Sequence, residues 1–403
     1  MAYFNPIRPS YIADPYPALA RLRAEAPVFF SEPHDAWIVT SYPECLAILH
    51  DQDTFASDPE HATGRARERI RGQRASQVLG DTPRIGQSDA PVHSRLRGTV
   101  AAVFTPRYIE GVRTFVAGEV ESLLDVRLHA DQPFDALKDF AALLPRAVIG
   151  EQVGAPEADR AQVLDWAMSL MQTAHADLTP ARRAEAEAAR DGLLGYLGRL
   201  ARGETGHSDS LLTRMARAEG DRLTREELLA LTIDVALAGN DTTANMIGNG
   251  VLALALNPEQ ETRLRASEDY GTAVDEMLRY DPPQQAIARF TTRAWTLRGR
   301  RIPEGATVLA HVAAANRDPV AYPNPDRFDV ARQGERHLSF GMGVHYCVGA
   351  PLAMIEAEAA IRGLLWRLTS IRLVPGVGLP RGPDWMLRSA GAVSLLTGEL
   401  LRR

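Results

Sequence analysis

The sequence predicts a mainly α-helical fold with minor β-structure, organised around one long central helix. Three observations lead to this class. Apolar residues recur at helical spacing along most of the 403 residues, and runs with strand-like alternation are short and few. The stretch 224–256 can form one continuous helix, roughly 48 Å long at 1.5 Å per residue. Since no internal repeat or low-complexity linker divides the chain, we expect a single domain spanning residues 1–403.

The other elements follow from apolar periodicity bounded by glycine, proline or polar clusters. This pattern predicts helices over 17–26, 42–50, 92–103, 107–127, 155–172, 180–202 and 211–218. Strands are expected over 37–40, 286–291 and 307–312, with a hairpin around Gly299. The polar, arginine-rich segment 61–91 shows neither pattern, so we expect it to be a long connection.

Composition excludes several classes of protein. The net charge of −6 argues against a nucleic-acid partner, which usually requires a basic face. No apolar run reaches the roughly eighteen residues that a membrane span needs, and the first residues lack a secretory apolar core. We therefore expect a cytoplasmic monomer with no membrane partner. The two cysteines, Cys45 and Cys347, are too few for a disulfide framework.

The long central helix contains a local conflict. Thr224 and Glu227 form a capping box at its start, and Asn257 with the following proline ends it. In between, "AGNDTT" (238–243) places a glycine, an acid and two threonines inside an apolar helix. Glycine costs about 1 kcal/mol relative to alanine there, and a buried carboxylate is unfavourable unless it is paired. Such a conflict indicates either a functional site or a structural kink with a solvated carboxylate.

The second unusual segment is "FGMGVHYCVGA" (340–350), in which Cys347 comes directly before an apolar helix. The partial positive charge and the free N–H groups at a helix N-terminus stabilise a thiolate. Gly341, Gly343 and Gly349 remove side chains, so a bulky planar partner could approach this backbone closely.

A lone thiolate has two chemical uses. It could be a nucleophile, with His345 as a conceivable base, or a metal ligand. A zinc site needs three or four protein ligands, and the sequence has no Cys-x-x-Cys or paired-histidine spacing. One cysteine as the single protein ligand fits haem iron, because the porphyrin supplies four further donors.

The loop resembles the cysteine-ligand loop of the cytochrome P450 superfamily. The matching positions are Phe340, Gly341, Gly343, His345, Cys347 and Gly349. The resemblance extends over essentially the whole chain. It implies a single large fold of this family, with a long central helix and small sheets, of the soluble bacterial type. It also implies haem b (iron protoporphyrin IX), with Cys347 as the axial ligand of the iron and Phe340 and Gly341 next to the cofactor.

The same resemblance assigns further residues. His93, Arg97, Arg289 and His345 match residues that bind the haem propionates. Glu276 and Arg279, at i and i+3 on one helix, match an ion pair that locks the following loop, here with Arg327. We interpret this pair as structural. Asp241 and Thr242, inside "AGNDTT", match the acid–alcohol pair that delivers protons during oxygen activation.

The resemblance therefore implies a monooxygenase that inserts one atom of O₂ into a hydrophobic small molecule. Its electrons would come from NAD(P)H through a separate reductase and a ferredoxin or flavodoxin. An acidic partner of this kind would face Arg336, Arg362 or Arg367. The residues expected to line the substrate pocket are Leu237, Ala238, Ala286, Ile287 and Met386.

Two alternatives remain open. One is a haem-thiolate enzyme with other chemistry, such as coupling or dehydration. The other is a haem-based binder or sensor, which Asp241 and Thr242 disfavour because sensing needs no proton delivery.

Overall fold

The computed structural model describes residues 4–76, 78–102, 104–129, 132–172, 179–206, 210–217 and 222–397. Its contacts divide the chain into two compact units. Unit 1 comprises Met1–Phe55, Gly111–Pro145 and Asp241–Arg403, and unit 2 comprises Ala56–Glu110 and Arg146–Asn240. The chain passes between the units four times, so neither unit is one continuous stretch. The single domain over residues 1–403 stays a prediction.

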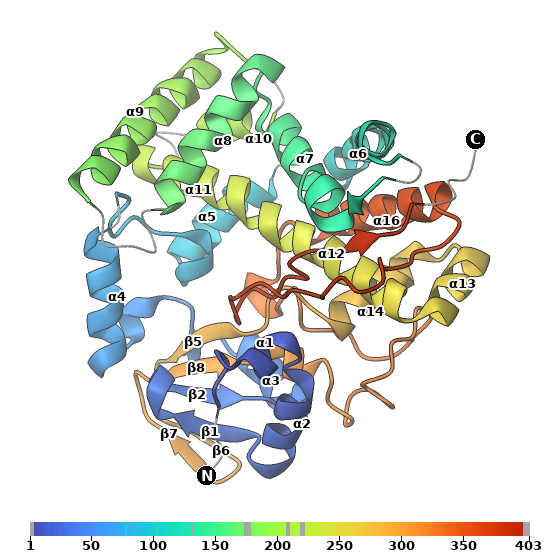
Figure 1. Cartoon of the computed structure of the whole chain (residues 1–403). Coiled ribbons are helices and arrows are strands. Elements are labelled where there is room, and N and C mark those ends of the chain that lie inside the picture. The colour runs from blue at the N-terminus through green and yellow to red at the C-terminus, as the bar shows by residue number, and fades with distance from the viewer. Residues whose placement is uncertain are drawn as a thin grey trace. The chain divides into compact units, whose positions relative to one another are not determined.

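The main sheet of unit 1 has five strands in the order β1-β2-β8-β5-β3 (Figure 1). β1 is antiparallel to β2, β2 is parallel to β8, and β8 is antiparallel to β5. The parallel pair brings Trp37 opposite Val308, so the N-terminal segment and the part of the chain after α14 form one sheet. The strands are β1 (Val28–Ser31), β2 (Ala36–Val39), β3 (Phe55–Ala56), β5 (Ile287–Thr291) and β8 (Thr307–Ala310).

Each face of this sheet is covered by its own apolar cluster. Val39 and Ala310 face a cluster that includes Phe55, whereas Ile38 and Leu309 face the cluster on the other side. This alternation is the period of two expected for a strand with both faces buried. The helices beside the sheet are α1 (Pro9–Ala13), α2 (Tyr16–Glu25), α3 (Tyr42–His50) and α15 (Val312–Ala315) (Figure 1).

The rest of unit 1 is mainly helical. α14 packs against α16, the helix that follows the cysteine loop (Figure 1). The helices are α6 (Pro106–Arg127), η4 (Ala136–Ala141), α7 (Leu144–Val153), α12 (Asn240–Leu256), α13 (Pro258–Ser267), α14 (Tyr270–Tyr280), η5 (Gly343–His345) and α16 (Ala350–Arg367), of which α6, α7 and α12 extend into unit 2. The small strands are β4 (Phe134–Asp135) with β9 (Ser394–Leu395), and the predicted hairpin β6 (Trp295–Leu297) with β7 (Arg300–Ile302).

Unit 2 is helical, and α8 packs against both α9 and α11. Its helices are η2 (Pro59–His61), α4 (Gly64–Ser76), η3 (Ile85–Gln87), α5 (Val92–Ala101), α8 (Glu157–Gln172), α9 (Pro180–Arg202), α10 (Leu211–Ala216) and α11 (Arg225–Ala238). The presence of α4 corrects the expected long connection over 61–91. Ala66 is buried on its inner face, while Arg67 and Arg74 on its outer side bond to Glu60. A nearly all-polar helix of this kind has too little apolar periodicity to be recognised from sequence.

The predicted long central helix is two helices. α11 begins with the expected capping box: Thr224 N–H donates to Glu227 Oε2 (2.9 Å), and Glu227 N–H donates to Thr224 Oγ1 (3.1 Å). α11 ends at Ala238, Gly239 lies in a turn, and α12 begins at Asn240. Glycine is a poor helix former and asparagine, aspartate and threonine favour helix starts, so the predicted conflict is resolved by ending one helix and starting another.

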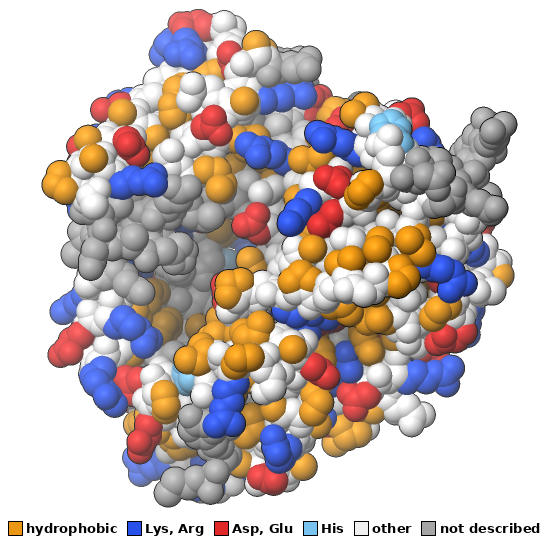
Figure 2. Space-filling view, viewed as in Figure 1, with side chains coloured by type: hydrophobic (Ala, Val, Ile, Leu, Met, Phe, Trp, Pro, Cys, Tyr) orange, Lys and Arg blue, Asp and Glu red, His pale blue; other side chains and the backbone are white. Residues whose placement is uncertain are grey.

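The surface agrees with the composition. On the face shown in Figure 2, acidic and basic side chains of the described residues are interspersed, without a continuous basic area. None of the helices in the described ranges is long and apolar enough to cross a membrane.

Candidate functional site

The cysteine loop of unit 1 is closed by its own backbone. Cys347 N–H donates to the carbonyl oxygen of Phe340 (2.9 Å), and Tyr346 N–H donates to that of Gly343 (3.1 Å). Ala350 N–H, at the start of α16, donates to Cys347 O (3.3 Å). The thiol itself is exposed. The loop is thus fixed while its sulfur stays accessible directly before a helix N-terminus.

The other cysteine lies in an opposite environment. Cys45 on α3 is fully buried, and its Sγ donates to the carbonyl oxygen of Val39 (3.3 Å). Burial raises the pKa of the Cys45 thiol far above its usual range. A protonated, buried thiol is inert, so of the two cysteines only Cys347 is placed to bind a metal.

The glycines of the loop have different reasons for their presence. Gly341 and Gly343 have φ of 68° and 69°, which a residue with a side chain adopts only with strain. A Cβ on Gly343 would lie 2.8 Å from the carbonyl oxygen of Leu49, so this glycine packs the loop on α3 rather than making room for a cofactor. At Gly349, a Cβ would have Cys347 Sγ as its only near neighbour, at 3.9 Å. The space beside the sulfur is therefore open at Gly349, as a planar group on the thiol requires.

Arg289 lies on the same sheet face as this loop. It alternates with Ile287 on β5, and the Cδ1 atom of Ile287 would lie 3.6 Å from a Cβ on Gly341. Arg289 is buried, and its Nη1 donates to the Ala288 carbonyl (2.8 Å). His345 is half-buried in η5. A buried guanidinium on this side of the sheet fits a carboxylate such as a haem propionate.

The other two residues expected at the propionates belong to unit 2. His93 is buried and Arg97 is half-buried, and both lie on α5 at i and i+4, on one helix face. The four expected residues are therefore divided equally between the units.

Asp241 and Thr242 occupy the first turn of α12 in unit 1. Asp241 is exposed and Thr242 is half-buried, whereas the residues from Thr243 to Leu254 are all buried. The partial positive charge of a helix N-terminus favours a carboxylate at this position. The break after Ala238 thus places the acid and the alcohol where the buried part of the helix begins.

The expected substrate-pocket residues lie in different surroundings, and their assignment to a pocket stays a prediction. Ile287 packs on the sheet face of the cysteine loop, whereas Ala286 is fully buried in the cluster on the opposite face. Strand alternation explains why two neighbours face opposite sides. Met386 is half-buried at the edge of that second cluster. Ala238 is exposed in unit 2, and the side chain of Leu237 lies outside the described residues.

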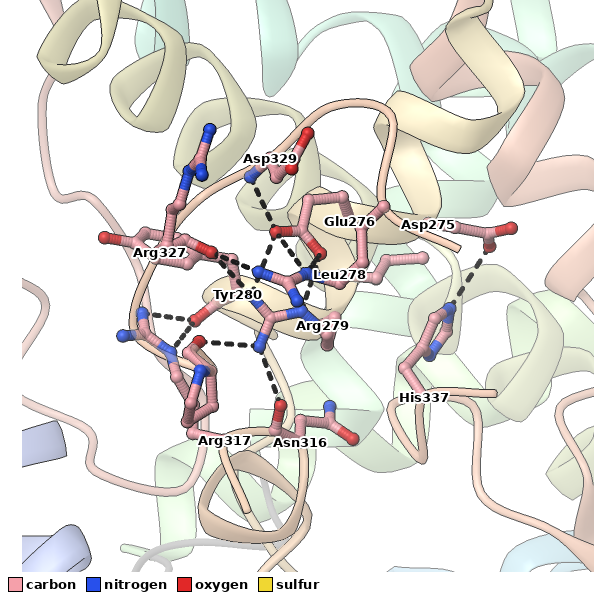
Figure 3. A network of polar contacts seen from close by, with 12 residues as sticks. Asp275, Glu276, Leu278, Arg279, Tyr280, Asn316, Arg317, Arg327, Asp329 and His337 are labelled. Carbon is pink, nitrogen blue, oxygen red and sulfur yellow. Dashed lines mark hydrogen bonds and ion pairs between the residues drawn. The ribbon is translucent and has the colours of Figure 1, made fainter. Parts of the chain in front are cut away.

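The Glu276–Arg279 pair is part of a buried network in unit 1 (Figure 3). Arg279 donates from Nε to Glu276 Oε2 (2.6 Å) and from Nη2 to Oε1 (2.9 Å), and both side chains are almost fully buried. Arg332 Nε contacts both carboxylate oxygens at 3.1–3.2 Å, and Asp329 N–H donates to Oε1 (2.8 Å). The carboxylate therefore has two guanidinium partners and a backbone donor.

The expected role of Arg327 in this network is wrong. Its side chain is exposed and points away from Glu276 (Figure 3), and only its backbone carbonyl takes part. That carbonyl accepts from Arg279 Nη2 (3.2 Å) and from Arg332 Nη2 (2.7 Å). The loop after Asn324 turns back so that the guanidinium of Arg332, five residues after Arg327, reaches the carboxylate. Sequence offered no signal for this choice, because the two arginines lie in the same polar segment.

A pocket of about 570 Å³ separates this network from the cysteine loop. Glu276 and Arg279 line one part of it, and Phe340 and Tyr346 line another. Charged and apolar side chains both line it, and it contains none of the residues expected to bind substrate.

The three arginines expected to face an acidic partner differ in their surroundings. Arg367 forms ion pairs with Asp125 (2.6 Å) and Glu121 (3.3 Å) of α6. Arg336 and Arg362 are exposed, and neither forms an ion pair within the described part of the chain. Arg367 is thus already paired with carboxylates, whereas the other two contact aromatic rings, Arg336 that of Tyr346 and Arg362 that of Tyr270.

Comparison with known proteins identifies the family. The family model described as Cytochrome P450 matches residues 187–269 and 271–378. The cytochrome P450 monooxygenase PikC of Streptomyces venezuelae is 39% identical over 396 residues, which cover 96% of this chain and 91% of that protein. The chain belongs to the cytochrome P450 family. The biotin biosynthesis cytochrome P450 of Bacillus subtilis is a further relative, 35% identical over 90% of this chain and 91% of that protein.

Solved cytochromes P450 have the same fold. The crystal structure of CalO2 superposes with a TM-score of 0.85 and 29% identity, over 99% of this chain and 100% of that one. The polyketide synthase cytochrome P450 PksS of Bacillus subtilis also gives 0.85, over 98% and 100%. The mainly helical fold with small sheets expected from the sequence is confirmed. As a cytochrome P450 monooxygenase, the protein uses haem and O₂, and the exposed thiol, the open space at Gly349 and the buried Arg289 fit the cofactor.

Proposed function

We propose that the protein inserts one oxygen atom of O₂ into a hydrophobic organic molecule. The other atom becomes water, which consumes two protons and two electrons. The electrons come from NAD(P)H through a reductase and a separate ferredoxin or flavodoxin. The observation that supports this most directly is that one unit contains both an exposed thiol in a fixed loop and an acid–alcohol pair at the start of a buried helix.

Cys347 would hold the haem iron through its sulfur. The N-terminus of α16 stabilises the sulfur as a thiolate, and the bond from Cys347 N–H to Phe340 O holds the loop in place. Arg289 and His345, together with His93 and Arg97, would bind the propionates. When bound, haem supplies a redox-active iron whose thiolate ligand favours cleavage of the O–O bond.

Asp241 and Thr242 would deliver the protons. The exposed Asp241 carboxylate can take a proton from solvent, and the half-buried Thr242 hydroxyl can pass it toward the buried side of α12. A carboxylate outside and a hydroxyl further inside form a relay that admits protons singly, without opening the site to bulk water.

This proposal is tested by single substitutions of the pair. With a surrogate ferredoxin and reductase, we expect Asp241→Asn and Thr242→Ala to lower product formation by 10- to 100-fold while NADPH oxidation continues and hydrogen peroxide accumulates. Thr262→Ala is the matched control, since Thr262 is an exposed helical threonine of α13 whose hydroxyl donates to Pro258 O (3.0 Å). Incorporation of label from ¹⁸O₂ into the product identifies insertion, and unlabelled product from all variants would contradict it.

We also propose a polyketide-derived substrate. Relatives named for such chemistry include the polyketide biosynthesis cytochrome P450 PksS (32% identical), the 6-deoxyerythronolide B hydroxylase (34%) and the mycinamicin IV hydroxylase/epoxidase (35%). The competing class is the secosteroid, because a vitamin D(3) 25-hydroxylase is 36% identical. A spectral titration of the haem with macrolactones, secosteroids, terpenoids and fatty acids distinguishes them. Saturable binding of the macrolactones alone supports the proposal, and binding confined to another class contradicts it.

The electron donor would be an acidic protein that faces Arg336 and Arg362. Because both guanidinium groups are exposed, the charge reversal Arg362→Glu should slow reduction by the donor most strongly at low ionic strength. The same substitution at Arg367, which already has two carboxylate partners, should matter less for docking.

A further inference from the structure

Arg336 lies on the rim of the 570 Å³ pocket and reaches the residue next to the haem ligand. Its Nη2 donates to the phenolic oxygen of Tyr346 (2.7 Å), and its guanidinium carbon lies 4.5 Å from the centre of the Tyr346 ring. Tyr346 directly precedes Cys347 in the chain. An exposed arginine is therefore bound, by two contacts of different kinds, to the side chain that adjoins the thiolate.

The backbone around Arg336 is fixed. Its carbonyl oxygen accepts from the hydroxyl of Tyr42 (2.8 Å), and the next residue, His337, contacts Asp275 through Nε2 (3.2 Å). Leu338 N–H then donates to Asn316 Oδ1 (2.8 Å). An exposed arginine is normally mobile and contributes little, but here the chain at and directly after Arg336 is anchored to other elements.

Tyr346 is in turn part of the ligand loop. Its ring lies 6.1 Å from that of Phe340 in an edge-to-face arrangement, and the Phe340 carbonyl accepts the Cys347 N–H. The position of the Tyr346 ring and the geometry at the sulfur are thus coupled through Phe340. A residue that holds this ring acts on the ligand without touching it.

The other charged groups of the pocket have different partners. Glu276 is paired with both Arg279 and Arg332 in the buried network, and Asp275 is bound by His337. Glu335 is exposed beside Arg336. The positive charge that is in direct contact with Tyr346 therefore belongs to Arg336.

We infer that Arg336 is a positioning residue for the Cys347 loop. Through its contacts with Tyr346 it holds a positive charge beside this loop, and this charge raises the reduction potential of the iron. A nearby positive charge weakens electron donation from the thiolate and favours the ferrous form, which carries one more electron. The inference rests on the proposed function, since it requires Cys347 to be the iron ligand.

The test is a redox titration of the haem-loaded protein without its electron donor. For Arg336→Gln, we expect the ratio of ferrous to ferric iron at a fixed potential to fall about threefold, which is about 28 mV at 59 mV per tenfold change. Tyr346→Phe should lower the ratio less, and the double variant should equal Arg336→Gln alone, because both changes break one link. Arg336→Lys, which keeps the charge, should retain most of the wild-type ratio.

A matched control and the salt dependence separate this role from a structural one. Arg362→Gln removes another exposed arginine that stacks on aromatic rings, over Tyr270 (5.0 Å), and should leave the ratio unchanged. At about 1 M salt the effect of Arg336→Gln should shrink, because the Debye length falls to about 3 Å. The inference alone would be overturned if Arg336→Gln left the ratio of ferrous to ferric iron unchanged. It would also be overturned if the effects of the two substitutions added up in the double variant, or if Arg362→Gln lowered the ratio as much as Arg336→Gln does. If the wild-type protein gives no thiolate-haem CO spectrum, the proposed function fails with it.

Discussion

The Glu276 network and the Cys347 loop border the same pocket but satisfy their polar groups in opposite ways. In the network, a nearly fully buried carboxylate has two guanidinium partners and a backbone donor. In the loop, the backbone is bonded internally and the thiol is exposed. A buried charge is tolerated only with complete pairing, whereas a ligand must keep a free position. The network therefore stabilises the fold and the loop supplies chemistry, and substitutions should separate the two effects.

The largest effect is expected at the ligand. Cys347→Ser should abolish the CO difference spectrum of a thiolate-ligated haem, while far-ultraviolet circular dichroism stays unchanged, because Cys347 is exposed and its loop is held by backbone hydrogen bonds. Cys45→Ser is the opposite case: it should keep the spectrum and lower the unfolding midpoint, since the buried thiol packs in the apolar cluster between α3 and the sheet. If the two variants gave the same CO difference spectrum, Cys347 and Cys45 would not have the different roles expected here.

The network should show the reverse pattern. Arg332→Ala leaves the Glu276 carboxylate buried with one guanidinium partner, so we expect a loss of about 3–5 kcal/mol in the free energy of unfolding. Arg327→Ala is the matched control, and it should cost less than about 0.5 kcal/mol because only its backbone takes part. Urea unfolding of the haem-loaded protein measures both. If Arg327→Ala lowered the free energy of unfolding as much as Arg332→Ala, the side chain of Arg327 would lock the loop, as expected from the sequence.

Two glycines of the loop are expected to have different roles, Gly343 in stability and Gly349 in haem binding. Gly343→Ala should destabilise the protein by about 1–3 kcal/mol, because a side chain at φ of 69° is strained and its Cβ would lie 2.8 Å from Leu49 O. Gly349→Ala should leave the unfolding of the haem-free protein unchanged and weaken haem retention, because its Cβ would occupy the space beside Cys347 Sγ. Thermal unfolding and the rate of haem transfer to apomyoglobin distinguish the two. Normal haem retention in Gly349→Ala would show that this space is not used.

An effect that is seen only when pH is varied concerns a buried carboxyl outside the Glu276 network. Glu356 on α16 is buried, and its Oε2 has no hydrogen-bond partner among the described residues. Burial raises the pKa of this carboxyl well above 4.5. The folded state keeps the proton above that pH while the unfolded state loses it, so stability falls as pH rises, by up to about 1.4 kcal/mol per unit. Glu356→Gln should flatten this slope between pH 5 and 8, and an unchanged slope would show that the carboxyl is ionised in the fold.

Local signals in the sequence predicted many elements closely. The helices expected over 42–50 and 180–202 agree with α3 and α9 at both ends. In α9 the reason is visible: Thr179 Oγ1 accepts from Arg182 N–H, and Gly203 ends the helix with a φ of 72°. Capping and termination depend on neighbours in the chain, which is why sequence can predict them.

The sequence-based predictions that failed concern residues whose roles depend on contacts with distant parts of the chain. Arg332 rather than Arg327 reaches Glu276 because of how the chain folds after Asn324, which residue type and spacing do not encode. Gly343 was interpreted as space for a cofactor, but the carbonyl of Leu49, almost three hundred residues earlier in the chain, sets that requirement. The sequence indicated a local conflict around Gly239. That this conflict ends one helix and starts another depends on the surrounding packing.

The interleaved path of the chain also limits how relatives of this protein can be recombined. Exchanging unit 2 for that of another cytochrome P450 replaces two separate segments, Ala56–Glu110 and Arg146–Asn240, and therefore creates four junctions. The donor segments would bring their own counterparts of His93 and Arg97, while Cys347 and Arg289 stay with the host. A chimaera that still retained haem would thus show that the proposed propionate ligands His93 and Arg97 can be exchanged for their counterparts in other family members. Recombination at a single crossover point could not test this, because it cannot exchange the two segments of unit 2 alone.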